Sequence, residues 1–370
     1  MSKIFIESSL VSKESQGSLT YLRELYKLIT LNGKSNTFIF GTYDSDIIEQ
    51  MFGTADNVCC YKYVFRNKFF RLFIETPFIL WKKKINCAHF QYITPFYKPR
   101  DCKYIVTIHD VLFMDYKQDF TLLYRVIRTF LFFISAKVSD LILTVSDYSR
   151  ERIASHFSIA LSKIKLTPNG ISDDFVNFKA TKEQSKKHVK AFKVENNFVL
   201  YVSRVEARKN QLLLLDFFEE TIVTDKSFTV VFVGSASHET GFISRFYVLK
   251  KAYPDNVFYF ETLKFKDLLH FYNSAQLFIY PSKCEGFGIP PLEAAVLGTP
   301  VLCSNLTAMA DFDFFNPWMF DPLTDKIIDS YKVLILQHDS AYQRRIRKII
   351  LEKYDWNIGA SLLLNYFNKL

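Results

Sequence analysis

The chain alternates between short apolar runs and longer stretches in which apolar residues recur every three or four positions. Runs such as Phe198–Val202 and Thr229–Val233 are almost continuously apolar, which predicts strands buried on both faces of a sheet. The segment Ser18–Leu31 has instead the helical period of an amphipathic helix. Strands that alternate with helices are typical of parallel, doubly wound α/β sheets. The strands predicted in this way are Lys3–Ile6, Thr37–Phe40, Tyr104–Ile108, Leu141–Val145, Lys163–Leu166, Phe198–Val202, Thr229–Val233, Val257–Phe260, Leu277–Tyr280 and Val301–Cys303.

The alternation pauses once, in a polar and lysine-rich stretch near residues 173–197. We expect a domain boundary there, between an N-terminal domain of residues 1–172 and a C-terminal domain that starts at residue 173 and ends near residue 347. A length of 370 residues agrees with two domains, at roughly 150 residues each. Both domains are expected to be Rossmann-like. Ligands of such sheets bind beyond the carboxyl ends of the strands, and two facing sheets form a cleft.

The net charge of +9 is concentrated in one part of the chain. Residues 61–85 contain seven basic residues, one acid (Glu75) and eight aromatic residues, so this segment alone carries +6. The mixture suits an anionic surface, either lipid headgroups or nucleic acid. A solvated basic face over a packed aromatic core is the alternative. Because no nucleic-acid-binding motif accompanies the segment, nucleic acid is not an expected partner.

Other features restrict the class of protein. The six cysteines form no C-x-x-C pair, which excludes a disulfide scaffold and a zinc site readable from the sequence. No stretch approaches the roughly 18 to 20 apolar residues of a membrane span. The N-terminus has the pattern of a first strand and not of a signal peptide. The sequence therefore predicts a cytoplasmic protein that is at most peripheral to a membrane.

The most informative segment follows the predicted strand Leu277–Tyr280. A glycine-containing loop leads there into a helix expected to start near Pro290. A helix N-terminus presents free N–H groups and the positive end of a dipole, which suit a phosphate. Since proline lacks an N–H, the expected donors are those of Gly288, Ile289 and Leu292.

Charged residues accompany this loop and a second one. Glu285 lies in the loop and Glu293 in the first helical turn, where carboxylates can accept hydrogen bonds from sugar or ribose hydroxyls. An ordinary strand-to-helix loop is the alternative. After the predicted strand Phe198–Val202, Arg204 and Lys209 could neutralise a diphosphate. Arg208 competes for this role, and a solvated, salt-bridged loop is again the alternative.

With the segments Tyr201–Asn210 and Pro281–Ala294, the chain resembles the retaining, nucleotide-sugar-dependent glycosyltransferases of family 4 (glycosyl transferases group 1), which have the GT-B fold. The second segment contains the family's E-x7-E signature, formed here by Glu285 and Glu293. The resemblance extends over essentially the full chain. It implies two Rossmann-like domains facing a cleft, with residues 348–370 as a final helix that crosses back onto the N-terminal domain.

The resemblance also implies roles for the donor site. The two cations would hold the donor diphosphate, Glu285 would meet the transferred sugar, and Glu293 would meet the ribose. In the loop expected to cradle the base, many relatives carry a glycine where this chain has Glu261, so the nucleotide stays open among UDP, GDP and dTDP. The residues assigned to the donor by the loops and the resemblance together are Gly17, Arg204, Lys209, Leu263, Glu285, Phe287, Gly288, Ile289, Leu292 and Glu293.

In the N-terminal half, Gly17 fits the glycine loop that contacts the donor phosphate in the family, although the usual second glycine is missing. A simple turn before an N-capped helix is the alternative. His109 and Asp110 follow the strand Tyr104–Ile108, at the carboxyl end where ligands bind. Since the family has a similar histidine in this place, His109 would contact the donor sugar. Asp110 would orient the loop or bind the acceptor.

The resemblance implies a reaction that moves a hexose from a nucleoside diphosphate sugar, as co-substrate, to a hydroxyl of a glycan or lipid-linked saccharide, with retention of configuration. It would serve surface polysaccharide assembly of the bacterial type. The segment Thr107–Asp110 favours mannosyl transfer from GDP-mannose. No cofactor and no metal are expected, and the Asp311–Asp313 triplet is interpreted as a chance match to a metal motif of another fold. Residues 61–85 are then a candidate for docking on an anionic inner membrane leaflet near a lipid-linked acceptor.

Two other classes compete with this interpretation. A catalytically inactive GT-B-like protein, peripheral to a membrane or binding carbohydrate, would keep the fold without the reaction. A nicotinamide-dependent dehydrogenase would need a G-x-G-x-x-G segment after the first strand of a domain, and neither half of the chain has one.

Overall fold

The computed structural model describes residues 2–9, 17–52, 55–236, 241–337 and 339–370. The chain divides into two compact units. The first unit comprises Met1–Gly170 and Asp355–Leu370, and the second comprises Ile171–Tyr354. The chain thus leaves the first unit after Gly170 and returns to it at Asp355.

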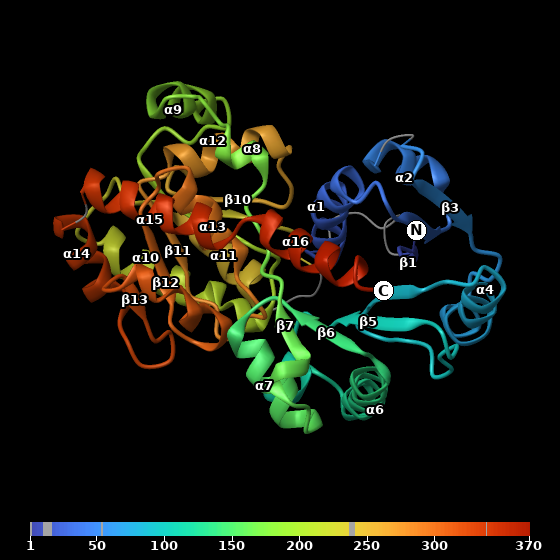
Figure 1. Ribbon diagram of the computed structural model, residues 1–370. Helices are drawn as coiled ribbons and strands as arrows, with labels where there is room; N and C mark the ends of the chain where they lie inside the picture. Colours follow the sequence, from blue (N-terminus) through green and yellow to red (C-terminus); the bar gives the residue numbers. More distant parts are fainter. Residues whose placement is uncertain (1, 10–16, 53–54, 237–240, 338) are drawn as a thin grey trace. The chain divides into compact units, whose positions relative to one another are not determined.

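The first unit is built on a seven-stranded parallel sheet of order β3-β2-β1-β4-β5-β6-β7 (Figure 1). Its strands are β1 (Lys3–Glu7), β2 (Thr37–Thr42), β3 (Val58–Lys62), β4 (Cys87–Gln91), β5 (Lys103–Thr107), β6 (Leu141–Thr144) and β7 (Ile164–Leu166). Its helices and short turns are α1 (Gly17–Asn32), α2 (Ser45–Phe52), α3 (Lys68–Phe70), η1 (Arg71–Glu75), α4 (Thr76–Lys82), α5 (Leu112–Asp115), η2 (Lys117–Asp119), α6 (Leu122–Val138), α7 (Asp147–Phe157), η3 (Leu161–Lys163) and α16 (Trp356–Phe367).

The last helix, α16, packs against α1 of the same unit. Asn36 donates a hydrogen bond to Asn368 over 3.2 Å, and the rings of Phe38 and Phe367 meet at 6.2 Å. The close approach needs a small residue, because a Cβ at Gly359 would lie 3.1 Å from the Leu25 side chain. The C-terminal segment is therefore part of the hydrophobic packing of the first unit.

The second unit is built on a six-stranded parallel sheet of order β10-β9-β8-β11-β12-β13. Its strands are β8 (Phe198–Val202), β9 (Thr229–Val233), β10 (Val257–Phe260), β11 (Leu277–Tyr280), β12 (Val301–Ser304) and β13 (Met319–Phe320). Its helices and short turns are α8 (Asp173–Val176), α9 (Lys182–Lys190), η4 (Ala207–Lys209), α10 (Gln211–Ile222), α11 (Phe242–Ala252), α12 (Phe265–Ser274), α13 (Ile289–Val296), η5 (Thr307–Phe315), α14 (Ile327–Gln337) and α15 (Ser340–Lys353).

The predicted α/β class with two Rossmann-like parallel sheets is confirmed. Each strand predicted from an apolar run is present, with ends that differ by at most two residues. The apolar runs do not predict β3, β4 and β13. The strand β3 lies at the sheet edge with a largely exposed face, β4 contains His89 and Gln91, and β13 has two residues. None of these strands has the continuous apolar run that marks a strand buried on both faces.

Candidate active site

Glu285 is the centre of a buried charged network in the second unit. It lies in the loop between β11 and α13 and is 6% exposed. The Lys209 Nζ donates a hydrogen bond to its Oε1 over 2.5 Å, and the Tyr280 hydroxyl donates to the same oxygen over 2.9 Å. Arg208 Nη1 lies 3.4 Å from the other oxygen, Oε2. Burial alone would raise the pKa of Glu285, but the charges of Lys209 and Arg208 outweigh it and lower the pKa to about 2. Glu285 is therefore a carboxylate at neutral pH.

The sheet topology explains why these residues meet. Strands β8 and β11 are hydrogen-bonded neighbours, with Leu277 opposite Val199. Parallel neighbours end at the same edge of a sheet, so the loops that follow them lie side by side. The two loops are joined by the Lys283 N–H, which donates to the Arg208 carbonyl over 2.8 Å, and by Arg208 Nη1, which donates to the Cys284 carbonyl over 2.9 Å. The backbone at Glu285 is held as well, because its N–H donates to the Thr307 hydroxyl over 2.9 Å.

The helix α13 begins directly beyond this carboxylate. Gly288 is its N-cap and has a φ of +92°, a left-handed conformation that favours glycine. A Cβ at this position would also lie 3.0 Å from the Met309 side chain. With Gly288 as the cap, the Leu292 N–H is the first that the helix satisfies internally, because an N–H bonds to the carbonyl four residues earlier. Gly288 and Ile289 thus remain the best-placed of the three expected backbone donors.

The three cations of the loop after β8 differ in their surroundings. The Lys209 side chain is 9% exposed and is committed to Glu285. The Arg208 side chain is 15% exposed and pairs with Glu206 over 2.6 Å as well as with Glu285. Arg204 is 59% exposed and, among the residues that the structure describes, makes one ion pair, with Glu206 at 3.1 Å. The salt-bridged loop weighed as an alternative is therefore present, and Arg204 is the cation of this loop most open to a ligand.

Glu293 lies in α13 and is partly buried. The Tyr272 hydroxyl donates a hydrogen bond to its Oε2 over 2.9 Å. Burial raises the pKa of Glu293 to about 7, since no positive charge compensates the lost hydration. The two glutamates of the E-x7-E pair therefore have opposite electrostatics: one is a permanent carboxylate and the other titrates near neutrality.

The remaining residues of the second unit that were assigned to the donor are the apolar residues Phe287 and Leu263. The Phe287 side chain is buried against the rings of Phe312 and Tyr354, at 5.8 and 5.5 Å, so only its backbone is suited to a ligand. Leu263 is half-buried in the loop between β10 and α12. The assignment of these residues to a bound nucleotide sugar stays a prediction.

In the first unit, His109 lies just after β5 and is 7% exposed. Its Nε2 lies 2.9 Å from the Gln91 side-chain oxygen, and the rings of Tyr21 and Tyr92 lie 4.9 and 5.1 Å away. Burial lowers the pKa of His109 to about 4, so the ring is neutral at physiological pH. Since the Gln91 oxygen can only accept, it holds His109 as the Nε2–H tautomer.

Asp110, expected to orient the loop or bind the acceptor, and Gly17, expected to contact the donor phosphate, are the other site residues predicted in the first unit. Asp110 accepts a hydrogen bond from the Leu112 N–H over 3.2 Å at the start of α5, which fits the orienting role. Gly17 is the first residue of α1, but the loop before it, residues 10–16, lies outside the described residues. Its contact with a phosphate stays a prediction.

Several residues of the site were not found by sequence reasoning. Tyr280 and Tyr272 donate to the two glutamates, and Gln91 orients His109. Tyr280 is the last residue of β11 and Gln91 the last of β4, so their places at the carboxyl ends of strands were the available signal. In the described part of the chain, no three His, Cys, Asp or Glu side chains cluster as metal ligands would. No helix in that part has the length and apolarity to cross a membrane.

Comparison with known proteins matches both halves of the chain to glycosyltransferase families. Residues 182–312 match the family described as glycosyl transferases group 1, and residues 48–175 match glycosyltransferase family 4. The chain is similar to the O-antigen chain mannosyltransferase B of Escherichia coli, with 30% identity over 55% of this chain and 53% of that protein. It is also similar to the O-antigen chain mannosyltransferase RfbU of Salmonella typhimurium, with 28% identity over 54% of this chain and 52% of that protein. The chain therefore spans about half the length of these relatives.

Solved structures agree with the fold over the full chain. A glycosyltransferase from Rickettsia africae has a TM-score of 0.71 at 17% identity, covering 100% of this chain and 98% of its own. Anabaena Alr3699/HepE, solved in complex with UDP, has a TM-score of 0.74 at 13% identity and covers both chains completely. At these identities the likeness concerns the fold, and it identifies the two-domain α/β architecture as the GT-B fold of glycosyltransferases.

Proposed function

We propose that this GT-B chain is a retaining hexosyltransferase that moves a sugar from a nucleoside diphosphate to an acceptor hydroxyl. The observation that carries the proposal is the buried carboxylate of Glu285, held by Lys209 and Arg208 beside the N-terminus of α13. A carboxylate fixed by two cations is an acceptor of known position for sugar hydroxyls. The two glycosyltransferase family matches support the same reaction class.

In the proposed reaction the bond between the anomeric carbon and the diphosphate oxygen breaks. The acceptor oxygen bonds to the same carbon on the same face, and the acceptor proton leaves with the diphosphate. The main catalytic requirement is stabilisation of the charge on the departing diphosphate. The exposed guanidinium of Arg204 and the N–H groups of Gly288 and Ile289 are suited to this task. Since these groups supply positive charge, we propose that the reaction needs no metal ion.

For the donor we propose GDP-mannose. The mannosyltransferase relatives support the sugar, and the segment Thr107–Asp110 favours it independently. A thermal-shift screen of GDP, UDP and dTDP sugars on the full chain tests the assignment, because a ligand that binds the native state raises the unfolding midpoint by mass action. A response to a UDP sugar without a response to GDP-mannose would replace the proposed donor.

For the acceptor we propose a saccharide or lipid-linked saccharide of surface polysaccharide assembly, met by a cytoplasmic enzyme at the membrane surface. The structure of residues 61–85 supports this location. Leu72, Ile79 and Leu80 of the segment are buried, but five of its eight aromatic residues are exposed, which a fully packed aromatic core would not leave. They are Phe65, Phe69, Phe70, Phe78 and Trp81. The lysines of residues 82–84 are exposed beside them, as an interfacial anchor for anionic lipid requires.

Transfer of labelled sugar by the full chain tests the enzymatic function against the inactive alternative. We expect Glu285→Gln to lower the rate at least about 100-fold, because the substitution removes the charge that orients the sugar. Glu220→Gln, on the exposed face of α10, is the matched control and is expected to keep the parent rate. A Glu285→Gln variant as fast as the parent would support the inactive carbohydrate-binding alternative and sink the proposal.

A further inference from the structure

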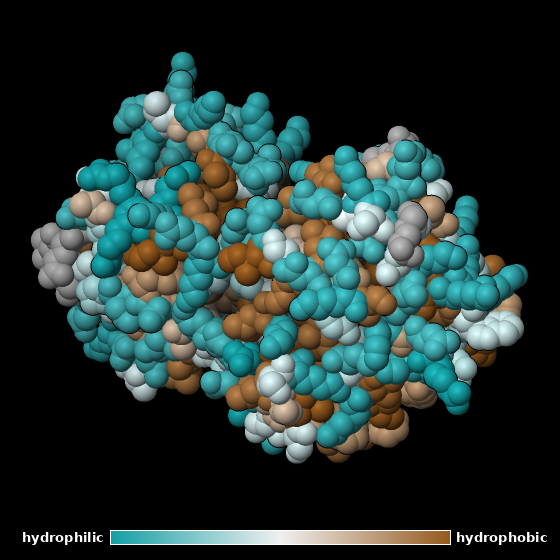
Figure 2. Space-filling model, in the orientation of Figure 1, coloured by the Kyte–Doolittle hydropathy of each residue, from teal (hydrophilic) through white to brown (hydrophobic). Residues whose placement is uncertain are grey.

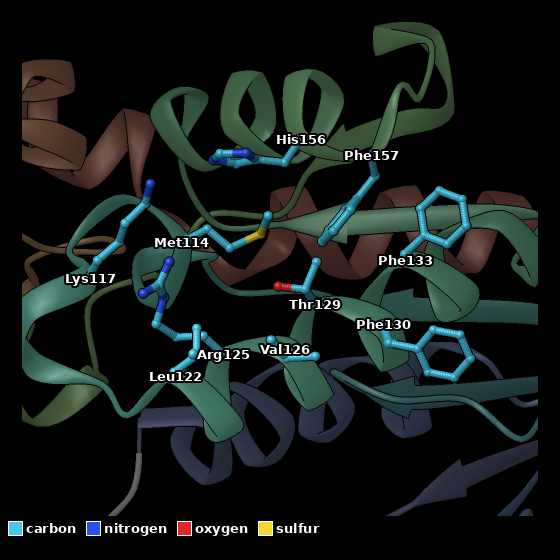
Figure 3. A pocket seen from close by; sticks show the side chains of 10 residues that line it. All are labelled: Met114, Lys117, Leu122, Arg125, Val126, Thr129, Phe130, Phe133, His156 and Phe157. Carbon is cyan, nitrogen blue, oxygen red and sulfur yellow. The ribbon is translucent and has the colours of Figure 1, made fainter.

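A cavity of about 550 Å³ lies in the first unit, away from the residues described above. It is formed by α5, η2, α6 and α7, and Figure 3 shows its side chains. Ligand cavities in proteins commonly measure about 300 to 1,000 Å³, so its size is that of a binding site. Most of its wall is apolar: Met114, Leu122, Val126, Phe130, Phe133 and Phe157.

The apolar wall continues onto the molecular surface along α6. Leu122 is 70% exposed, Val126 58% and Phe130 59%. Figure 2 shows hydrophobic residues gathered over this helix. Large apolar side chains gain free energy when they are removed from water. A row of them left uncovered marks a surface that binds something apolar.

One end of the cavity is basic. Figure 3 shows the Lys117 amine and the Arg125 guanidinium on the same side, away from Phe130 and Phe133. In the part of the chain that the structure describes, neither cation has a hydrogen bond or an ion pair through its side chain, and the Arg125 Nε is buried without an acceptor. A buried donor without a partner is costly, and an anion would satisfy it. The whole of α6 contains no acidic residue that could do so.

A second, polar cavity of about 360 Å³ continues from this basic end. It shares Met114, Lys117 and His156 with the first cavity and adds Asp115, Tyr148 and Arg152. Asp115 accepts hydrogen bonds from the Tyr148 hydroxyl over 3.0 Å and from His156 Nε2 over 2.8 Å. This pairing fixes α5 against α7, so the polar end is preorganised. The composite cavity therefore passes from apolar walls, through two unpaired cations, to a set of polar groups.

We propose that the composite cavity binds one molecule of a lipid phosphate, with the chain along α6, the phosphate between Lys117 and Arg125, and the head beside Tyr148 and Arg152. The order of apolar, cationic and polar groups matches the order of chain, phosphate and head in such a molecule. A bilayer surface alone does not require a concave site with a polar end. The inference rests on the proposed function in one respect: the lipid would be the anchor of the acceptor, and α5 begins just after the loop that carries His109 and Asp110.

Binding of farnesyl phosphate to the full chain, measured by titration calorimetry below its aggregation concentration, tests the site. Farnesol carries the chain without the charge, and inorganic diphosphate carries the charge without the chain. We expect both to bind at least about tenfold more weakly than farnesyl phosphate. Arg125→Gln and Lys117→Gln should each weaken farnesyl phosphate about tenfold and leave farnesol unchanged. Arg128→Gln, the same change on the same helix but lining a different groove, is the control and should bind as the parent does.

The unfolding midpoint of each variant shows whether it is folded. If one of Arg125→Gln and Lys117→Gln is misfolded, the other still tests the site. Equal binding of farnesol and farnesyl phosphate would overturn the proposal, and so would binding of farnesyl phosphate by both Arg125→Gln and Lys117→Gln as tightly as by the parent. Binding to vesicles of phosphatidylcholine with phosphatidylglycerol, without binding of farnesyl phosphate in solution, would also overturn it in favour of simple bilayer docking. A thermal shift with nucleotide sugars on the same samples separates the two hypotheses, because it reports the donor site of the second unit.

Discussion

The pair formed by Lys209 and Glu285 gives a quantitative prediction, because both charges are buried and lie 2.5 Å apart. The pKa of Glu285 falls from its ordinary 4.5 to about 2. At about 1.4 kcal/mol per tenfold change in proton affinity, this corresponds to roughly 3 kcal/mol of native-state stabilisation at pH 7. Lys209→Met removes the nearest cation and leaves the carboxylate with Arg208 alone. Loss of one partner of a buried pair costs about 3 to 5 kcal/mol, so we expect Lys209→Met to lower the free energy of unfolding by about 3 kcal/mol.

A double-mutant cycle separates the pair from other effects of the substitutions. The variants Lys209→Met, Glu285→Gln and the double variant are unfolded in urea at pH 7, with tryptophan fluorescence as the signal. Because the double variant leaves no unpaired buried charge, it should be more stable than the sum of the single losses by about 2 to 3 kcal/mol. A coupling energy near zero would refute the interpretation that these two charges hold each other.

The pH dependence gives an independent check of the same pair. A carboxyl whose folded pKa lies below its unfolded value contributes stability above the unfolded value, and this contribution is lost as the pH falls through the folded value. The stabilisation by Glu285 is therefore complete above about pH 4.5 and disappears between about pH 4.5 and pH 2. Over this window the parent should lose more stability than Glu285→Gln. Parallel pH profiles of the two proteins would contradict the depressed pKa.

Three further predictions concern the donor site and the membrane. The pKa of Glu293 is raised to about 7, so Glu293 becomes a better hydrogen-bond acceptor for the ribose as the pH rises through 7, and the affinity for the nucleotide sugar should increase. Glu293→Gln should flatten this pH dependence in fluorescence titrations, and an unchanged slope would contradict the role. Gly288→Ala places a Cβ at a φ of +92° and 3.0 Å from Met309, so it should lower the free energy of unfolding in urea by about 1 to 3 kcal/mol and weaken binding of the nucleotide sugar. In the control Gly298→Ala, at a φ of +80° with open space around the Cβ, only the backbone strain should lower the stability. Equal effects of the two substitutions would count against the close approach to Met309. The triple change of Lys82, Lys83 and Lys84 to Gln should weaken binding to phosphatidylglycerol vesicles about 100-fold in co-sedimentation, because about 1 kcal/mol per lysine sums to about 3 kcal/mol. An unaffected variant would refute docking through residues 61–85.

The sequence predicted which residues belong to the candidate site better than it predicted the contacts between them. Glu285 and Lys209 were identified because each follows an apolar strand in a loop with unusual composition. Their direct pairing depends on β8 and β11 being neighbours in the sheet, and strand order is not contained in the pattern of any one segment. Tyr280, which donates a hydrogen bond to Glu285, was missed for the same reason, since a tyrosine at the end of an apolar strand has the pattern of a core residue. A tyrosine can bury its ring in the core while its hydroxyl makes a hydrogen bond, and only the structure shows that the Tyr280 hydroxyl does so.

The basic segment illustrates the opposite limit. Its composition predicted an anionic partner surface or a packed aromatic core. The structure shows rings of both kinds, since Tyr63 is buried whereas Phe69 and Trp81 are 58% and 64% exposed, and the anionic partner stays a prediction. A composition cannot assign individual rings to the two faces of a short, irregular helix. The helix α6 also has basic residues and no acidic one, but its cavity arises from packing against α5 and α7, which the sequence of the helix alone does not predict.

The commitment of Lys209 to Glu285 changes how the charges of the donor site must be divided. A cation that already neutralises a buried carboxylate contributes little net positive charge to a diphosphate, so Lys209 acts on the donor chiefly by fixing Glu285. Arg208 is divided between Glu206 and Glu285 in the same way. In the proposed reaction, the positive field available to a leaving diphosphate would then come from Arg204 and from the N-terminus of α13. Among the described residues, Arg204 has one ion-pair partner, Glu206, and its own side chain is 59% exposed, so this pair contributes little energy. In the proposed reaction the buried network would thus supply the geometry for the sugar, and the exposed arginine and the helix terminus would supply the charge for the diphosphate.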